Sequence, residues 1–516
     1  MLLYALLCHC GVFYMKNLVG YQWLSKKYKV SPVQSFEFKP ISGQAGKNRS
    51  DTLSWHITFA LKHEGIHLEF LNRLFKAIKE TELVDWINSE PSGQYARRAG
   101  FLYEWCTDRT LECPGVTVGN YVDMIDSESY FTSGSPDNNS RWRVRDNLPG
   151  TRDYCPMVCR TGAIRAAEAY DCGKEIKALE LEFGEDLLMR SAVWLSIKES
   201  MASFAIERED KFVDRARRFA AAMERYCGFY SDPLNNQAIT ELQKEILGPQ
   251  ALHYGIRKSP IFVGESGLDY TPRVHYIAPH WESTHSMLTG LSAFSDRTAD
   301  KSAIVRAAIM SFGFVYIHPM TDGNGRISRF LINDMLRRDG AIPDPFILPV
   351  SAAIMSSPKN RKAYDQIMDV FSKPFMLHYR DNYEFGEDKI AVDGVHYDID
   401  FDAYEDANSA WRYPDFTKHV EYLAEILELT INSEMRNEAG YLRSLNDARC
   451  GIKEFMDGPN KDIDRIIRSI IDSDYKISNK LKKEFEGLLM PDVANSVIEV
   501  VSRSFAAKID GEPRIR

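Results

Sequence analysis

The segment that decides the fold is His318-Pro319-Met320-Thr321-Asp322-Gly323-Asn324-Gly325-Arg326-Ile327-Ser328-Arg329. It lies between two apolar stretches with helical spacing, so it reads as a short loop that enters the N-terminus of a helix. One face of that helix is apolar and carries Ile327, Phe330, Leu331 and Met335. The helix is expected to end at Arg338, because Gly340 and Pro343 follow it.

The loop has the residue types that bind a phosphate chain. Gly323 and Gly325 allow backbone N–H groups to approach a ligand closely. The helix N-terminus adds a positive partial charge, which attracts anions. Arg326 and Arg329 lie on one face of the first turn, where two cations oppose the helix dipole. A bound polyphosphate would compensate both charges.

Two further side chains complete a site for phosphoryl transfer. Asp322 is a hard oxygen ligand, suited to a Mg²⁺ ion that bridges phosphates. His318 can accept a proton from an attacking hydroxyl group near neutral pH. A single histidine before proline, or a single Gly-Asn-Gly turn, is usually structural. Their occurrence together within twelve positions indicates a catalytic site.

This segment resembles the signature of the Fic (Fido) family, His-x-Phe-x-Asp/Glu-Gly-Asn-Gly-Arg-x-x-Arg. Each specified position matches except Met320, where the family usually has an apolar Phe that packs into the core. The resemblance implies a mainly α-helical protein with a Fic-type core. It also implies a protein adenylyltransferase, which transfers AMP from Mg-ATP to a Ser, Thr or Tyr hydroxyl group of a target protein.

The family's residue roles carry over to the matching positions. His318 would deprotonate the target hydroxyl group, and Asp322 would hold Mg²⁺. The phosphates of ATP would be bound by Gly323, Asn324, Gly325, Arg326 and Arg329. Among these, Arg329 would bind the γ-phosphate. Gly325 favours AMP transfer over phosphorylation, because the related Doc kinases have Lys at that position.

A β-hairpin is predicted before the motif, over residues 257–277, with a turn near Val263-Gly264-Glu265-Ser266-Gly267. In Fic proteins a hairpin flap at this place binds the target segment by strand addition. The candidate docking residues are Ile261, Val263, Val274 and Tyr276. The alternative is an ordinary surface hairpin, and the sequence alone does not separate the two.

Many Fic proteins also carry an inhibitory helix with the pattern Ser/Thr-x-x-x-Glu-Gly/Asn, whose Glu pairs with the second motif Arg. Ser203 and Glu207 have this spacing in a helical stretch near residues 195–210, although Arg208 stands where Gly or Asn is expected. Glu64 is a rival, because Gly65 follows it. We prefer Glu207, since it lies closer to the motif along the chain. The alternative is that Glu207 is a surface carboxylate.

The composition limits the class of protein. The 516 residues exceed one typical domain, and 44% hydrophobic with 27% charged residues is the balance of a soluble globular protein. The net charge of -9 argues against a general electrostatic contact with nucleic acid or an anionic membrane. The nine cysteines lack zinc-ribbon spacing. We expect a cytoplasmic protein with reduced thiols and with neither nucleic acid nor membrane as a partner.

We expect four segments. They are a possible upstream extension at residues 1–14, a mainly helical region at 15–229 that is extended or irregular up to about residue 50, the Fic domain at 230–385, and a C-terminal helical region at 386–516. The apolar start is too short to span a bilayer and lacks the basic beginning of a secretory signal. The segment 380–402 is expected to be β-like or irregular, and the acidic run Glu384–Asp402 within it is interpreted most simply as a solvated loop. The expected partners are ATP and a protein target, and the oligomeric state, a homodimer included, stays open.

Alternative functions remain at this point. The core could bind a nucleotide or a partner without catalysis, although the intact His318 and Asp322 argue against this. It could transfer a group from another donor, such as UTP. The same site could also remove AMP from a modified protein.

Overall fold

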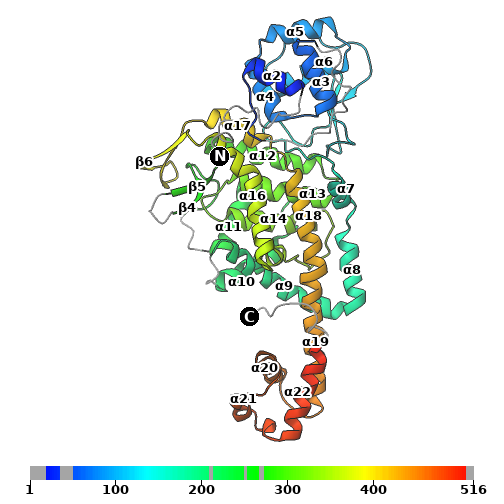
Figure 1. Ribbon diagram of the computed structural model, residues 1–516, viewed down its shortest axis with the longest axis vertical. Coiled ribbons are helices and arrows are strands. Elements are labelled where there is room, and N and C mark those ends of the chain that lie inside the picture. The colour runs from blue at the N-terminus through cyan, green and yellow to red at the C-terminus, as the bar shows by residue number, and fades with distance from the viewer. Residues whose placement is uncertain (1–18, 35–49, 209–212, 249–252, 267–271, 507–516) are drawn as a thin grey trace.

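The structure, a computed structural model, describes residues 19–34, 50–208, 213–248, 253–266 and 272–506. The possible extension at residues 1–14 and Gly267 of the predicted turn lie outside these ranges. Three groups of helices follow one another along the long axis (Figure 1). Each group has its own buried apolar core. No helix among the described residues has the length and apolar character needed to cross a bilayer.

The N-terminal unit is built from short helices and a small sheet. In order its elements are α2 (Gly20–Tyr28), α3 (Leu53–Phe59), the π-helix η1 (Ala60–Glu64), α4 (Leu68–Ala77), α5 (Glu80–Ser89), α6 (Gln94–Thr107), β1 (Val122–Asp123), β2 (Asp137–Asn139) and β3 (Val144–Asp146). The strands lie in the order β1-β3-β2, with β1 parallel to β3 and β2 antiparallel to it. Trp142 fills the middle of this unit and is fully buried.

Helix α2 corrects the expectation that residues 15–50 are extended or irregular. The Glu64 carboxylate accepts hydrogen bonds from the N–H groups of Val19, Gly20 and Tyr21 and so caps the start of α2. Tyr21 and Leu24 then pack into the core at a spacing of three. The cap comes from more than forty residues away, so the local sequence pattern could not indicate it.

The central unit is mainly α-helical, as predicted. Its helices are α7 (Gly162–Ala169), α8 (Cys172–Phe183), α9 (Glu185–Ile206), α10 (Val213–Tyr226), α11 (Asn236–Leu247), α12 (Trp281–Arg297), α13 (Ala303–Ile317), α14 (Asn324–Arg338), α15 (Val350–Met355), α16 (Pro358–His378), α17 (Tyr404–Arg412) and α18 (Thr417–Leu429). Its strands form two hairpins, β4 (Phe262–Ser266) with β5 (Pro272–Ile277), and β6 (Tyr383–Ile390) with β7 (His396–Phe401).

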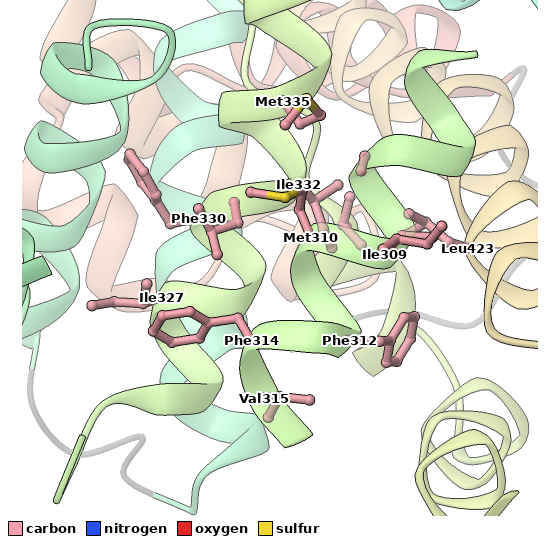
Figure 2. Packing of buried hydrophobic residues seen from close by; sticks show 14 of the residues in the cluster. Ile309, Met310, Phe312, Phe314, Val315, Ile327, Phe330, Ile332, Met335 and Leu423 are labelled. Carbon is pink, nitrogen blue, oxygen red and sulfur yellow. The ribbon is translucent and has the colours of Figure 1, made fainter. Parts of the chain in front are cut away.

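Helix α13 lies at the centre of this unit because it is apolar on all sides, which is typical of a fully buried helix. Every residue from Ile304 to Ile317 is buried. The adjoining face of α14 packs beside it, and Figure 2 shows Phe314 of α13 near Ile327 and Phe330 of α14. The motif loop therefore joins two helices that the core holds rigidly.

The acidic segment Glu384–Asp402 lies in the β6–β7 hairpin, which agrees with the β-like expectation for residues 380–402 and corrects the interpretation as a solvated loop. Its apolar residues alternate with the acids. Ile399 and Phe401 are buried, and the Phe385 ring lies 5.5 Å from the ring of Phe262 at the start of β4. One face of the hairpin thus packs on the core, while the carboxylates take the other face.

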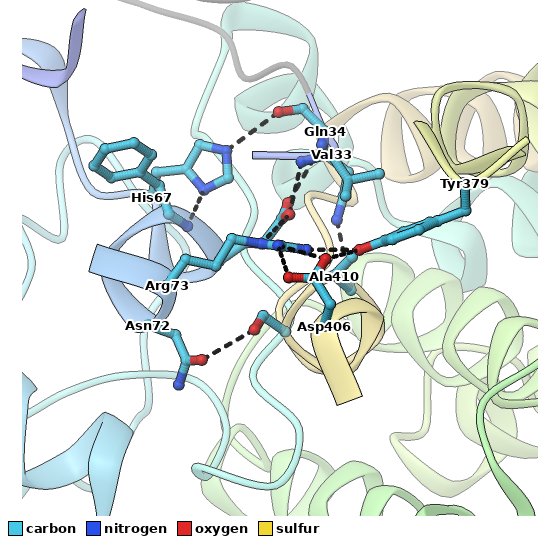
Figure 3. Close-up of polar contacts among 11 residues, drawn as sticks. Val33, Gln34, His67, Asn72, Arg73, Tyr379, Asp406 and Ala410 are labelled. Atoms are coloured by element: carbon cyan, nitrogen blue, oxygen red, sulfur yellow. Dashed lines mark hydrogen bonds and ion pairs between the residues drawn. The ribbon is translucent and has the colours of Figure 1, made fainter. Parts of the chain in front are cut away.

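A partly buried set of polar contacts joins the N-terminal unit to the central unit (Figure 3). Arg73 of α4 donates to the Asp406 carboxylate at 2.8 Å and to the Tyr379 hydroxyl at 2.8 Å. The Gln34 side chain donates to the Ala410 carbonyl at 3.1 Å. These bonds link α4 to α16 and α17.

The C-terminal unit extends away from the motif. The π-helix η3 (Thr430–Met435) and the start of α19 (Arg436–Lys453) still pack on the central core. The C-terminal unit contains the rest of α19 with α20 (Asn460–Asp472), α21 (Asn479–Glu484), the 3-10 helix η4 (Glu486–Leu489) and α22 (Pro491–Phe505). Its core includes the apolar face of α20, made of Ile463, Ile466, Ile467 and Ile470.

We expect Glu64→Ala to lower the protection of the α2 amides against hydrogen exchange. The change leaves buried N–H groups without an acceptor, at about 1–3 kcal/mol each. Exchange of residues 19–28 should accelerate, whereas the exposed Glu112→Ala should leave it unchanged. Equal protection in both variants would contradict the capping role.

Candidate functional site

The motif loop is closed by the side chain of Asn324. Its Oδ1 accepts from the Met320 N–H at 3.0 Å, and its Nδ2 donates to the Met320 carbonyl at 2.7 Å. Met320 itself is fully buried in the core. The side-chain amide of Asn324 is therefore used to shape the loop, so any contact of Asn324 with a phosphate would come from its backbone N–H.

A glutamine from α11 holds the loop from outside. Gln243, which is fully buried, donates to the Asp322 carbonyl at 3.1 Å and to the His253 carbonyl at 3.2 Å. It also accepts from the Gly255 N–H at 2.7 Å. Gln243 could not be predicted from the sequence, because one glutamine in an amphipathic helix belongs to no recognisable pattern.

His318 ends α13 in the left-handed conformation, with φ 50°. Its Nδ1 lies 3.0 Å from the Val315 carbonyl oxygen. A carbonyl only accepts, so Nδ1 carries the proton and Nε2 has the lone pair. Burial lowers the pKa of His318 to about 4, and Arg257 acts in the same direction against the Val315 hydrogen bond. The ring is therefore neutral at pH 7.

Asp322 provides one carboxylate for a hard cation. Its side chain is 57% exposed, and its Oδ1 accepts from the Gly323 N–H at 2.6 Å and from Arg326 Nη2 at 2.9 Å. Among the described residues, no three His, Cys, Asp or Glu side chains gather as a metal cluster. Mg²⁺ is usually held by one or two carboxylates together with substrate phosphates. Asp322 alone fits a metal that binds with a nucleotide.

Both motif arginines are buried at the start of α14, each 2% exposed. The Arg326 guanidinium lies over the Phe204 ring, 4.9 Å from its centroid. Arg329 donates from Nε to the Ser203 hydroxyl at 2.7 Å, and from Nη2 to the Ser203 carbonyl at 3.1 Å. Phe204 and Ser203 lie in the last turns of α9, so α9 covers this end of the motif helix.

Glu207, directly after α9, forms an ion pair with Arg329 at 2.7 Å. Burial raises the pKa of Glu207, but the nearby Arg329, together with Arg326 and His318, outweighs this effect and the net pKa is lowered. The carboxylate also lies above Gly325. A Cβ atom at position 325 would be 2.1 Å from Glu207 Oε1. The structure therefore brings Ser203 and Glu207 to Arg329, while Glu64 lies in the separate N-terminal unit (Figure 1).

Arg208 stands where the inhibitory pattern Ser/Thr-x-x-x-Glu-Gly/Asn has Gly or Asn, and its backbone conformation gives a reason for that preference. Its φ is 62°, in the left-handed region, and its N–H donates to the Ala205 carbonyl at 3.0 Å. This conformation ends the helix, and it strains a residue that has a Cβ atom. Gly323, with φ 88°, takes the same region at the start of α14 without that cost.

The predicted hairpin is present as β4 and β5, with a register shift between Val263 and Gly264. Val263 is 40% exposed, and Ile261 lies just before β4 with its carbonyl bonded to Ala278. Val274 is partly buried against the central core. Tyr276 is buried, and its hydroxyl donates to the Tyr316 carbonyl at 2.5 Å. The Tyr276 side chain therefore anchors the hairpin, so any contact of position 276 with a docked strand would come from its backbone.

Comparison with known proteins adds to this geometry. The Fic/DOC family model matches residues 233–336. "Protein adenylyltransferase fic-1" of Caenorhabditis briggsae is 36% identical over 116 residues, which are 22% of this chain and 20% of that protein. Its namesake in Caenorhabditis elegans is 34% identical over 123 residues, 23% of this chain and 22% of that protein. The matched region thus spans about a fifth of either relative.

A solved structure of a Fic family protein from Desulfovibrio desulfuricans G20 is also similar. The match covers 69% of this chain and 90% of that protein, with a TM-score of 0.35 and 16% identity.

The family model includes α11, the β4–β5 hairpin, α12, α13 and most of α14. These elements surround the motif loop. Residues 233–336 of this chain are therefore a domain of the Fic/DOC family.

Proposed function

We propose that this chain is a protein adenylyltransferase that transfers AMP from Mg-ATP to a protein hydroxyl group, and that Glu207 holds it in an inhibited form. The observation that carries the proposal is the position of the Glu207 carboxylate. It lies above Gly325 at the N-terminus of α14 and pairs with Arg329. An anion of the protein itself thus occupies a site suited to phosphate.

The electrostatics of this site support a polyphosphate ligand. Arg326 and Arg329 are both buried near a helix N-terminus, where the backbone also favours negative charge. Two desolvated cations need a compensating anion, because an unpaired buried charge is costly. Asp322 and Glu207 supply this charge here. In the active form, the phosphates of ATP would take the place of Glu207.

His318 is suited to act as the base. In the proposed step, the target hydroxyl oxygen forms a bond to the α-phosphorus, and the bond from that phosphorus to the α–β bridging oxygen breaks. Pyrophosphate leaves, and the hydroxyl proton passes to Nε2 of His318. When bound, Mg²⁺ neutralises charge on the phosphates, and Asp322 would hold it. Gly325 has no side chain that would enter the proposed phosphate site, which supports AMP transfer in preference to phosphorylation.

Labelled nucleotides test the activity. With Mg²⁺ and ATP labelled at the α-phosphate, we expect the Glu207→Gly variant to label itself or added proteins at least about tenfold faster than the parent protein. A change of this size corresponds to the loss of ~1.4 kcal/mol of inhibition. His318→Ala in the same background should reduce labelling about a hundredfold or more. Glu64 is a second buried glutamate, and the substitution Glu64→Gln should leave the labelling rate at the parent level.

Each other result has a definite meaning. Label that arrives only from the γ-phosphate indicates a kinase, and label only from UTP indicates another donor. Folded Glu207→Gly protein that binds ATP without any transfer would indicate a binding module. Faster labelling by Glu64→Gln, but not by Glu207→Gly, would assign the inhibition to Glu64.

Arg208→Gly should strengthen inhibition. Glycine removes about 1 kcal/mol of left-handed strain at the end of α9, which corresponds to roughly fivefold slower basal AMP transfer. Arg208→Ala is the matched control, because it also removes the long side chain but retains the Cβ atom. The basal rates of both variants should be compared in parallel. A Gly variant as fast as the Ala variant would show that the strain has no effect.

The His318 ring should titrate far below its ordinary range. Because its pKa is lowered to about 4, the ring should stay neutral as the pH falls from 7 to 5. NMR of protein with ¹³C-labelled histidine measures this, and His318→Asn identifies the signal. A midpoint near 6.5 would contradict the described surroundings of the imidazole.

A further inference from the structure

Arg257 is a buried arginine outside the motif. It lies in the segment between α11 and β4 and is 2% exposed. Each nitrogen of its guanidinium donates to a different backbone carbonyl. The acceptors, each at 2.7 Å, are His318 for Nε, Ser259 for Nη1 and Pro279 for Nη2. Its backbone N–H also donates to the Pro319 carbonyl at 2.8 Å.

The partners of Arg257 differ from those of other buried arginines. Arg306 and Arg329 each pair with a carboxylate, Asp339 and Glu207 respectively. Arg257 forms no ion pair with a carboxylate in the described part of the chain. The Asp393 carboxylate acts on the pKa of Arg257 only at a distance, through its charge. Burial lowers its pKa to about 10, so it stays charged at neutral pH. A buried cation held by carbonyls alone is costly and suggests a role beyond packing.

The three carbonyls come from three parts of the site. Ser259 lies before β4, Pro279 follows β5, and His318 ends α13. One planar group therefore joins both ends of the β4–β5 hairpin to the backbone of His318. The rigid fork of a guanidinium suits this task, because it fixes the directions of its donors.

We infer that Arg257 is a positioning residue, which holds His318 in its left-handed conformation and couples it to the base of the hairpin. The inference rests on the proposed function, in which His318 is the base. A non-glycine residue with φ 50° persists only where its surroundings enforce it. A charge-assisted hydrogen bond to the carbonyl of that same residue is a strong constraint.

The charge of Arg257 has a second effect on the imidazole. Three charged groups face His318: Arg257 lowers its pKa, whereas Glu207 after α9 and Asp322 in the loop raise it. Arg257 therefore helps to keep the ring neutral beside two carboxylates. The geometric effect and the charge effect can be separated by substitution.

The test uses Arg257→Lys and Arg257→Gln in the Glu207→Gly protein. Lysine retains the charge but cannot reach three carbonyls with a planar fork, and glutamine removes the charge as well. We expect both to slow the maximal rate of auto-AMPylation about 10- to 100-fold, as misplacement of a reacting group does. The ATP concentration for half-maximal rate should stay within about twofold, because no phosphate contact is removed.

The midpoint of the His318 titration, measured by NMR, separates a positioning role from a loss of packing, because a loss of packing alone would leave this midpoint unchanged. Arg257→Gln should raise the midpoint towards the ordinary value, while Arg257→Lys should leave it near that of the parent. Arg306→Lys is the matched control, because Arg306 is equally buried and also donates to a carbonyl, that of Thr298. It should lower stability and leave both the maximal rate and the titration unchanged.

Parent-like rates and titration in folded Arg257→Lys and Arg257→Gln would overturn the inference. If Arg257→Gln does not fold, the Arg257→Lys variant alone tests the inference. A lower maximal rate with an unchanged His318 titration midpoint is expected only if Arg257 is a positioning residue. If the Glu207→Gly parent transfers no AMP, the proposed function fails. The titration of Arg257→Gln then still tests whether Arg257 controls the imidazole.

Discussion

The buried positive charge of Arg329 is the constraint around which the site is arranged. Almost no water reaches the guanidinium, so its neighbours must supply both hydrogen-bond acceptors and a negative charge. The last turns of α9 meet the need, with the Ser203 hydroxyl and the Glu207 carboxylate. The long helix α9 therefore lies against α14 with its C-terminal end at the motif, and the glycine at 325 leaves room for the carboxylate.

A second constraint is the packing that fixes both ends of the motif loop. Helix α13 is buried on all sides, and α14 packs along it, so the loop between them has fixed ends. Asn324 and Gln243 then remove most of the remaining freedom of the loop backbone. The proposed binding of a flexible phosphate chain in one geometry would depend on supports of this kind.

The sequence predicted the parts of this site that belong to a local pattern. The loop between two helices, the hairpin before it, and the spacing of Ser203 and Glu207 are all short-range features, and the structure has them at those positions. The contacts of Gln243 and Arg257 depend on chain segments that meet only in the fold, so no pattern could indicate them. Helix α2 was missed for the same reason, because its cap is Glu64. The acidic hairpin was expected only as a β-like or irregular segment, because its many carboxylates favour a solvated loop even though apolar residues alternate with them.

The position of Glu207 at the very end of α9 determines how the site can open. Ser203 and Glu207 at the end of α9 contact Arg329, while the preceding turns pack against α10 and α15. The final turn is itself packed, because Phe204 and Ile206 are buried and the Arg326 guanidinium lies over the Phe204 ring. Release of Arg329 would therefore expose apolar surface and also break the ion pair, so opening needs a compensating ligand. In the proposed adenylyltransferase, bound phosphates would supply part of that compensation, so the strength of inhibition would depend on how tightly this single turn is packed.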